Sequence, residues 1–222
     1  MSLLEFKNVS FSNNNDKILK NINIEIDRGD YISIVGSSGS GKSTFLKLCS
    51  HLISPTEGTI NYKGKSIMEI NPLELRKEIA YCFQTPYLFG DIVKDNIVFP
   101  YTIRNEKVKF DSALKLFETF NLTEDYLNKE IKNLSGGEKQ RIALIRTLLF
   151  KPEILLLDEV TSALDADNTL IVEKAVKSLN DEKITILWVT HNIEQSKRNA
   201  NKLLTIEAGQ IKSLELIKNE QQ

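Results

Sequence analysis

The chain has 222 residues, of which 41% are hydrophobic and 27% are charged, the balance of a soluble globular protein. Its 29 basic and 30 acidic residues give a net charge of −1, without the basic surplus usual in nucleic-acid binders, so we expect no nucleic-acid partner. No stretch approaches the roughly 18 continuous apolar residues of a membrane-spanning helix, and charges near the N-terminus argue against a signal peptide. We therefore expect a cytoplasmic protein whose membrane part, if any, is supplied by a partner.

Short apolar runs alternate with helical stretches along the chain, which predicts an α/β fold with a mostly parallel sheet. Between residues 84 and 150 no clear strand occurs and helical patterns dominate, so we expect a helical lobe inserted between core strands. Cys49 and Cys82 are expected to be core thiols, and the polar tail 218–222 is expected to fray. The predicted strands are 4–11, 22–26, 31–35, 59–62, 79–83, 154–157 and 184–189, with a closing hairpin of 203–207 and 211 onward.

A glycine-rich loop follows the strand predicted at 31–35. Gly36–Ser43 reads Gly-Ser-Ser-Gly-Ser-Gly-Lys-Ser and matches G-x-x-x-x-G-K-[ST], between a strand and a helix as that motif requires. The glycines let several backbone N–H groups face one point, and the helix N-terminus favours an anion there. Lys42 supplies a cation for the β- and γ-phosphates, and Ser43 is a candidate Mg²⁺ ligand. The loop therefore predicts a site for ATP and Mg²⁺.

The apolar strand 154–157 runs into two acids, Asp158 and Glu159. Asp158 is placed to hold Mg²⁺, directly or through water, and Glu159 to polarise a water that attacks the γ-phosphate. Taken alone, this pattern also fits a strand that ends in solvent-exposed acids. The neighbouring phosphate loop favours the catalytic interpretation.

Leu134–Gln140 reads Leu-Ser-Gly-Gly-Glu-Lys-Gln and predicts a second helix start. Ser135 and Glu138 have the spacing of a capping box, while Gly136 and Gly137 leave the backbone uncovered for an anion. The local alternative is an ordinary helix cap. Two phosphate-binding helix ends beside a single phosphate loop predict a dimer, in which each chain offers its second site to the nucleotide of the other.

Three single residues are further candidates because of where they lie in the pattern. Gln84 ends a strand and would reach Mg²⁺ or the attacking water, His191 ends another and would contact the γ-phosphate, and Phe11 would stack on adenine. Each residue, taken alone, is more often structural.

The order of these motifs resembles the nucleotide-binding domain of ABC transporters over essentially the whole chain. That order is Phe11, Gly36–Ser43, Gln84, Leu134–Gln140, Asp158–Glu159, Ser162–Asp165 and His191. The resemblance implies a P-loop NTPase core of the RecA type, with an N-terminal antiparallel β subdomain and an inserted helical subdomain. It implies one domain over 1–222, with 1–84 and 150–222 as the core and 85–149 as the helical subdomain carrying the signature motif.

The resemblance also implies a role for each matching residue. Two chains would sandwich the nucleotide, and Asp165 would couple the two sites. Phe11 and Glu138 stand where many relatives have tyrosine and glutamine, which preserves stacking and capping. The implied ATP-binding residues are Phe11, Gly36, Ser37, Ser38, Gly39, Ser40, Gly41, Lys42, Ser43 and Thr44. The catalytic residues are Glu159, His191, Gln84 and Lys42; the Mg²⁺ ligands are Ser43, Gln84 and Asp158; those acting in trans are Ser135, Gly136, Gly137 and Glu138.

A narrower match is similar to the ATP-binding subunits of iron-export ABC systems. It rests on Tyr81–Asp91, Asp95–Ile97, Phe99–Pro100 and Leu187–His191. It implies an ATPase held on the inner face of the cell membrane by a multi-spanning permease that docks on the residues after Gln84. The alternatives are an ABC ATPase for lipid, peptide or drug export or for import, a DNA-repair ATPase, a translation factor, or a switch without turnover. Residues 42–158 lack the coiled coils or zinc modules of repair ATPases, a translation factor usually carries two cassettes, and Glu159 argues against a switch.

Overall fold

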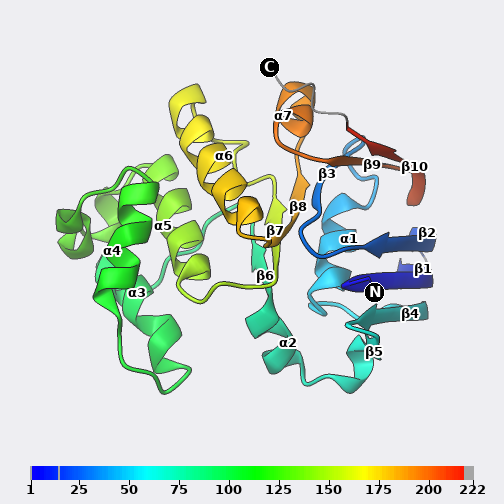
Figure 1. Cartoon of the computed structure of the whole chain (residues 1–222), viewed down its shortest axis with the longest axis horizontal. Coiled ribbons are helices and arrows are strands. Elements are labelled where there is room, and N and C mark those ends of the chain that lie inside the picture. Colours follow the sequence, from blue (N-terminus) through cyan, green and yellow to red (C-terminus); the bar gives the residue numbers. More distant parts are fainter. Residues whose placement is uncertain (1, 15, 218–222) are drawn as a thin grey trace. The chain divides into compact units, whose positions relative to one another are not determined.

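The computed structural model describes residues 2–14 and 16–217, and its strands form two sheets (Figure 1). Within those residues, one sheet has four strands in the order β2-β1-β4-β5, and the other has six in the order β10-β9-β3-β8-β7-β6. The four-stranded sheet is antiparallel and contains β1 (Leu4–Asn13), β2 (Asp16–Ile26), β4 (Glu57–Tyr62) and β5 (Lys65–Ser66). The six-stranded sheet contains β3 (Tyr31–Val35), β6 (Ile79–Cys82), β7 (Ile154–Asp158), β8 (Thr185–Val189), β9 (Lys202–Glu207) and β10 (Gln210–Leu216).

The two sheets differ in burial as their sequences predict. Every residue of β7 and β8 is buried, which matches their continuous apolar runs and the parallel pairing of β9, β3, β8 and β7. In β2, buried Ile22, Ile24 and Ile26 alternate with exposed residues, as expected for a strand that buries one face. The predicted α/β fold with a parallel sheet is confirmed.

The described chain falls into two compact units, each with its own helices. The first draws on Met1–Tyr81, Pro152–Glu159 and Leu179–Gln222, and the second on Cys82–Lys151 and Val160–Ser178. In the first unit, α1 (Lys42–Cys49) contacts β2, β7 and β8, and its Phe45, Leu46, Leu48 and Cys49 are buried. The short helices α2 (Pro72–Glu78) and α7 (Ile193–Arg198) begin at the side-chain caps Asn71 and Asn192.

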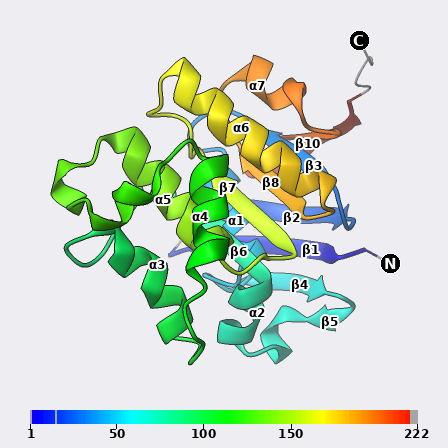
Figure 2. The same cartoon turned by 60° about the vertical axis from the view of Figure 1, so that its left-hand side comes forward.

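The second unit is helical. Its helices α3 (Val93–Thr102) and α4 (Phe110–Thr119) both contact α5 (Gly136–Leu148) (Figure 2). The guanidinium of Arg141 in α5 donates to the carbonyl oxygen of Phe120 at 2.9 Å, so α5 is tied to the end of α4. Short 3₁₀ turns cover Ile67–Glu69 in the first unit and Glu124–Asn128 and Ile131–Asn133 in the second. Within 2–14 and 16–217, no helix has both the length and the apolar character needed to cross a bilayer.

Two segments differ from the sequence-based expectation. We expect all of 150–222 in the core, but Val160–Ser178, which carries most of α6 (Ala166–Asp181), groups with the helical unit. The reason is local packing, since Leu164 and Asn168 lie beside Gly137 at the start of α5. Helix α2 was not predicted. The expected fraying of the polar tail, Lys218–Gln222, concerns residues outside those described.

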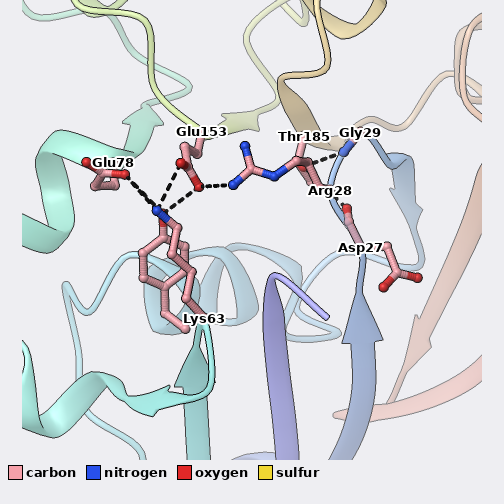
Figure 3. Close-up of polar contacts among 8 residues, drawn as sticks. Asp27, Arg28, Gly29, Lys63, Glu78, Glu153 and Thr185 are labelled. Carbon is pink, nitrogen blue, oxygen red and sulfur yellow. Dashed lines mark hydrogen bonds and ion pairs between the residues drawn. The ribbon is translucent and has the colours of Figure 1, made fainter. Parts of the chain in front are cut away.

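A polar network joins strand ends of the first unit (Figure 3). Glu153, just before β7, accepts hydrogen bonds from Arg28 at 2.9 Å and from the Tyr62 hydroxyl at 3.0 Å. Lys63 lies 2.9 Å from the other oxygen of Glu153 and 3.2 Å from Glu78. The network therefore links the β2–β3 turn, the end of β4 and the starts of β6 and β7.

The balance of burial and hydrogen bonding at Glu153 makes this network sensitive to pH. Burial raises the pKa of the Glu153 carboxyl, but hydrogen bonds from Lys63, Arg28 and Tyr62 outweigh it and hold the pKa below the ordinary value of 4.5. A carboxylate with a lowered pKa contributes stability above its unfolded-state pKa and loses that contribution as the pH falls through its folded-state pKa.

We predict that Glu153→Gln lowers the free energy of unfolding by about 1–2 kcal/mol at pH 7, because its charge-assisted hydrogen bonds are lost. The difference from the parent should shrink as the pH falls below 4.5, where the parent carboxylate becomes protonated. Urea unfolding at several pH values measures both quantities. Glu74→Gln is the control: Glu74 is paired with Lys77 but its side chain is 62% exposed, so we expect less than about 0.5 kcal/mol. A Glu153→Gln deficit that is the same at pH 7 and at pH 3.5 would contradict this explanation.

Candidate functional site

The loop between β3 and α1 has a backbone shape that glycine makes possible. Gly36 has φ +149° and its backbone lies so close to β9 that an added Cβ would stand 2.0 Å from the Ile206 carbonyl oxygen. Gly41, immediately before α1, has φ +103° and would carry a Cβ 2.6 Å from the Leu19 side chain. Side chains at these two positions would displace the loop, so the spacing of the two glycines reflects the packing of the loop on β9 and β2.

Lys42 folds back across this loop. Its ammonium donates to the carbonyl oxygens of Gly36 at 3.0 Å and Ser37 at 2.8 Å, and the residue is buried. Burial lowers the pKa of the Lys42 ammonium, while the carboxylates of Glu159 and Asp158 oppose this effect. The loop thus holds the Lys42 ammonium next to its own carbonyl groups, and a phosphate approaching the loop would meet this positive charge.

The N-terminus of α1 provides donors for the same anion. Among the described residues, no side chain caps this helix, and its N-cap is Gly41 in the left-handed conformation. Backbone N–H groups in the first turn of a helix have no partner within the helix and favour an anion there. The hydroxyl of Ser40 is buried and, in the part of the chain that the structure describes, has no hydrogen-bond partner. The loop and the start of α1 therefore combine uncapped helix N–H groups, an unpaired hydroxyl and a cation within a short segment.

Ser43 and Asp158 come together from different motifs. The Ser43 hydroxyl donates to Asp158 Oδ1 at 2.9 Å, joining α1 to the end of β7. Because the proton of this hydroxyl is directed at the carboxylate, the oxygen lone pairs of Ser43 stay available for a cation. Mg²⁺ prefers such hard oxygen ligands, supplied by one or two carboxylates together with phosphate oxygens. These residues fit the expected ion.

Glu159 and His191 also lie together, at the ends of the neighbouring strands β7 and β8. His191 Nε2 is 2.8 Å from Glu159 Oε1, and the Glu159 side chain is 16% exposed against 49% for His191. Glu159 has φ +50°, a left-handed conformation that is strained for a residue with a side chain and that occurs often at functional sites. Its backbone N–H donates to the Val189 carbonyl at 3.1 Å, which holds the turn in place.

The signature segment, residues Leu134–Gln140, forms a complete helix cap at the start of α5 in the second unit. The Ser135 hydroxyl accepts from the Glu138 N–H at 3.2 Å, and the Glu138 carboxylate accepts from the Ser135 N–H at 2.7 Å. The predicted capping box is therefore confirmed. Burial raises the pKa of Glu138, but hydrogen bonds from the Tyr126 hydroxyl and from Ser135 lower it overall. In this cap the Ser135 hydroxyl accepts from the Glu138 N–H, and a Cβ on Gly136 would meet no atom within 4 Å.

The remaining predicted site residues come from several other positions in the chain. Asp165 accepts hydrogen bonds from the Asn168 N–H at 2.8 Å and from its side-chain amide at 2.7 Å, so it caps α6. Phe11 lies in β1, partly buried against the hydrophobic core. Gln84 follows β6 in the second unit and is exposed. Of the other loop residues, Ser37, Ser38 and Gly39 are exposed and Thr44 is half-buried in α1.

Tyr81 contacts the predicted site residue Asp158, although the sequence analysis assigned no site role to Tyr81. Its hydroxyl donates to Asp158 Oδ2 at 2.5 Å, although the two residues are 77 positions apart in the chain. The signal needed to find it was the adjacency of β6 and β7 in the sheet, which the spacing of apolar runs does not reveal.

Comparisons with known proteins agree with this geometry. The family model described as "ABC transporter" matches residues 19–162. The chain is 44% identical over 206 residues to the "Probable iron export ATP-binding protein FetA" of Escherichia coli K12, covering 92% of this chain and 91% of that protein. It is 37% identical over 196 residues to "ABC transporter I family member 17" of Arabidopsis thaliana, covering 88% and 74%.

A solved structure adds the fold of a whole cassette. The dimeric ATP-binding cassette MJ0796, in a post-hydrolysis state with ADP and Pi, matches with a TM-score of 0.87 and 28% identity, over 97% of this chain and 99% of that one. The whole described fold therefore matches that of a solved ATP-binding cassette. The chain belongs to the ABC transporter family, as an ATP-binding subunit that hydrolyses ATP.

Proposed function

We propose that this chain hydrolyses ATP to drive the export of iron or a related metal through a separate membrane permease. The observation that carries the proposal is the 44% identity, over 92% of the chain, to a protein described as a probable iron export ATP-binding protein. The level and extent of this identity favour a shared transport role more than the family motifs do, because those motifs occur in ABC ATPases of many functions.

The chemistry begins with the placement of the triphosphate on Gly36–Thr44. The backbone N–H groups at the start of α1 and the Lys42 ammonium hold the β- and γ-phosphates. Ser43 and Asp158 would hold Mg²⁺, with Gln84 as a further ligand, and the ion would neutralise charge on the phosphates. Phe11 would provide an aromatic face for adenine.

Glu159 is the proposed general base. Its carboxylate would accept a proton from the water whose oxygen bonds to the γ-phosphorus. The bond between that phosphorus and the bridging oxygen breaks, and ADP leaves. His191, 2.8 Å from Glu159, holds the carboxylate in one orientation and offers its ring to the γ-phosphate. The strained backbone of Glu159 fixes the direction of the side chain, which the narrow geometry of in-line attack demands.

A second copy would complete each site with its signature segment. The Ser135 hydroxyl, the uncovered backbone at Gly136 and the N–H of Gly137 would suit the γ-phosphate of a nucleotide bound to the other chain. Asp165, which caps α6, would link the two sites. The dimeric form of the MJ0796 cassette supports this arrangement.

The segment after Gln84 is the proposed docking surface for the permease. Tyr87 is 74% exposed and Phe99 is 44% exposed, whereas Leu88, Phe89 and Ile92 are partly buried. Arg146 in α5 holds this segment by donating to the Tyr87 carbonyl at 2.8 Å and by lying 4.5 Å from the Phe89 ring centroid. Since α5 begins at the signature, closure of an ATP-bound dimer would move the docking surface with it.

We predict that Glu159→Gln lowers the rate of ATP hydrolysis by at least about 100-fold while ATP still binds, because an amide does not accept the proton of the attacking water. The variant should accumulate as an ATP-bound dimer in size-exclusion chromatography with Mg²⁺ and ATP. Glu74→Gln, which alters an exposed carboxylate in α2, serves as the control. Hydrolysis by Glu159→Gln at the parental rate would remove Glu159 from the role of base.

We also predict that cells lacking this chain accumulate iron and grow poorly under iron excess or peroxide, because export would have lost its energy source. Cellular metal content by mass spectrometry and growth curves measure this, and complementation with the parent but not with Glu159→Gln provides the control. Unchanged metal content and tolerance, in a strain whose parent expresses the permease, would contradict iron export. The chain would then be an ABC ATPase that drives the transport of another substrate.

A further inference from the structure

Asp158, the carboxylate at the end of β7, has protein partners on both of its oxygens. Ser43 donates to Oδ1 at 2.9 Å and Tyr81 donates to Oδ2 at 2.5 Å. Asp158 is 7% exposed, so solvent contributes little to its orientation. All three residues belong to the first unit.

The two partners differ in whether they are themselves proposed to bind the metal ion. Ser43 is itself a proposed metal ligand, so its hydroxyl would be shared between the ion and Asp158. Tyr81 stands on β6, which neighbours β7 in the sheet, and its ring packs against the hydrophobic core. A tyrosine ring on a strand has few rotatable bonds, and its hydroxyl is held where the sheet places it. Tyr81 is therefore the fixed partner of the carboxylate.

The orientation of the carboxylate matters because the terminal torsion of aspartate is soft. Rotation about the Cβ–Cγ bond has a broad, roughly two-fold profile, so a carboxylate tied only through Ser43 would turn. A second hydrogen bond, from Tyr81 to Oδ2 at 2.5 Å, removes that freedom and leaves Oδ1 facing Ser43. Partners that orient metal-binding carboxylates typically change metal affinity 10- to 100-fold when they are removed.

We propose that Tyr81 is a positioning residue which orients Asp158 and thereby sets the affinity of the ATP site for its divalent cation. This inference rests on the proposed Mg²⁺-binding role of Ser43 and Asp158. Tyr81 itself contacts neither nucleotide nor ion in this scheme. Its effect should appear in the dependence on the metal and hardly at all in the binding of nucleotide without metal.

The test compares Tyr81→Phe, which removes only the hydroxyl, with the parent. Binding of Mn²⁺ in the presence of a non-hydrolysable ATP analogue is measured by the loss of the free-ion signal in electron paramagnetic resonance. Nucleotide affinity is measured separately in EDTA, and ATPase is measured over a range of Mg²⁺ concentrations. The control is Tyr101→Phe, which removes a hydroxyl that donates weakly to the Lys109 carbonyl at 3.5 Å within the helical unit.

We expect Tyr81→Phe to weaken Mn²⁺ binding and to raise the half-saturating Mg²⁺ concentration roughly tenfold, the lower end of the range for such partners. The maximal rate at saturating Mg²⁺ should fall less than this, and nucleotide affinity in EDTA should stay within twofold of the parent. Tyr101→Phe should change none of these quantities. Unchanged metal affinity in Tyr81→Phe, or an equal loss of nucleotide affinity in EDTA, would overturn the inference.

A double-mutant cycle separates this inference from the proposed site on which it rests. If Tyr81 acts through Asp158, then Tyr81→Phe should add little to the loss of metal affinity in Asp158→Asn. Fully additive losses would show that Tyr81 acts by another route and would overturn the inference alone. Parental Mn²⁺ affinity in Asp158→Asn would instead remove Asp158 from the proposed Mg²⁺ site.

Discussion

The hydrogen bond from Ser43 to Asp158 joins the two motifs on which the chemistry depends. Ser43 is the second residue of α1, directly after the proposed phosphate-binding loop, and Asp158 ends β7, 115 residues later in the chain. The bond forms because α1 packs against β7 and β8, whose fully buried strands leave few positions for the end of the loop. The same packing places Lys42 within the influence of the carboxylates of Asp158 and Glu159. The residues proposed to bind phosphate and Mg²⁺ are thereby brought close together.

Most of the first unit could be predicted because its elements carry strong local signals. The apolar runs of β3, β7 and β8 and the glycine-rich loop before Lys42 each determine structure over a few residues. Helix α2 was missed although its start carries a signal, because Asn71 caps it and Pro72 occupies its first turn. The assignment of Val160–Ser178 failed for a different reason: α6 follows a core strand in sequence but packs beside Gly137 in the helical unit.

The site residues that belong to a sequence motif could be predicted. The contacts that depend on the order of strands in the sheet could not. Ser43, Asp158, Glu159 and His191 follow from motifs and strand ends, and the structure brings them together as two bonded pairs. The Tyr81–Asp158 contact depends on β6 and β7 being neighbours in the sheet, which no local pattern encodes. Phe11 and Gln84 are not part of a longer sequence motif, so their proposed roles depend on the family resemblance.

We propose that each nucleotide site of this ATPase is shared between two chains, and mixed variants test this sharing most directly. Lys42→Ala weakens the phosphate loop of its own chain, and Ser135→Arg fills the signature of its own chain. Each variant alone should be inactive, whereas a mixed dimer contains one site with an intact Lys42 from one chain and an intact Ser135 from the other. We expect ATPase activity to reappear when the two purified variants are mixed, up to about half of the parental rate per mixed dimer if the sites act independently. No recovery in mixtures shown to contain folded mixed dimers, with the permease present, would contradict a shared site.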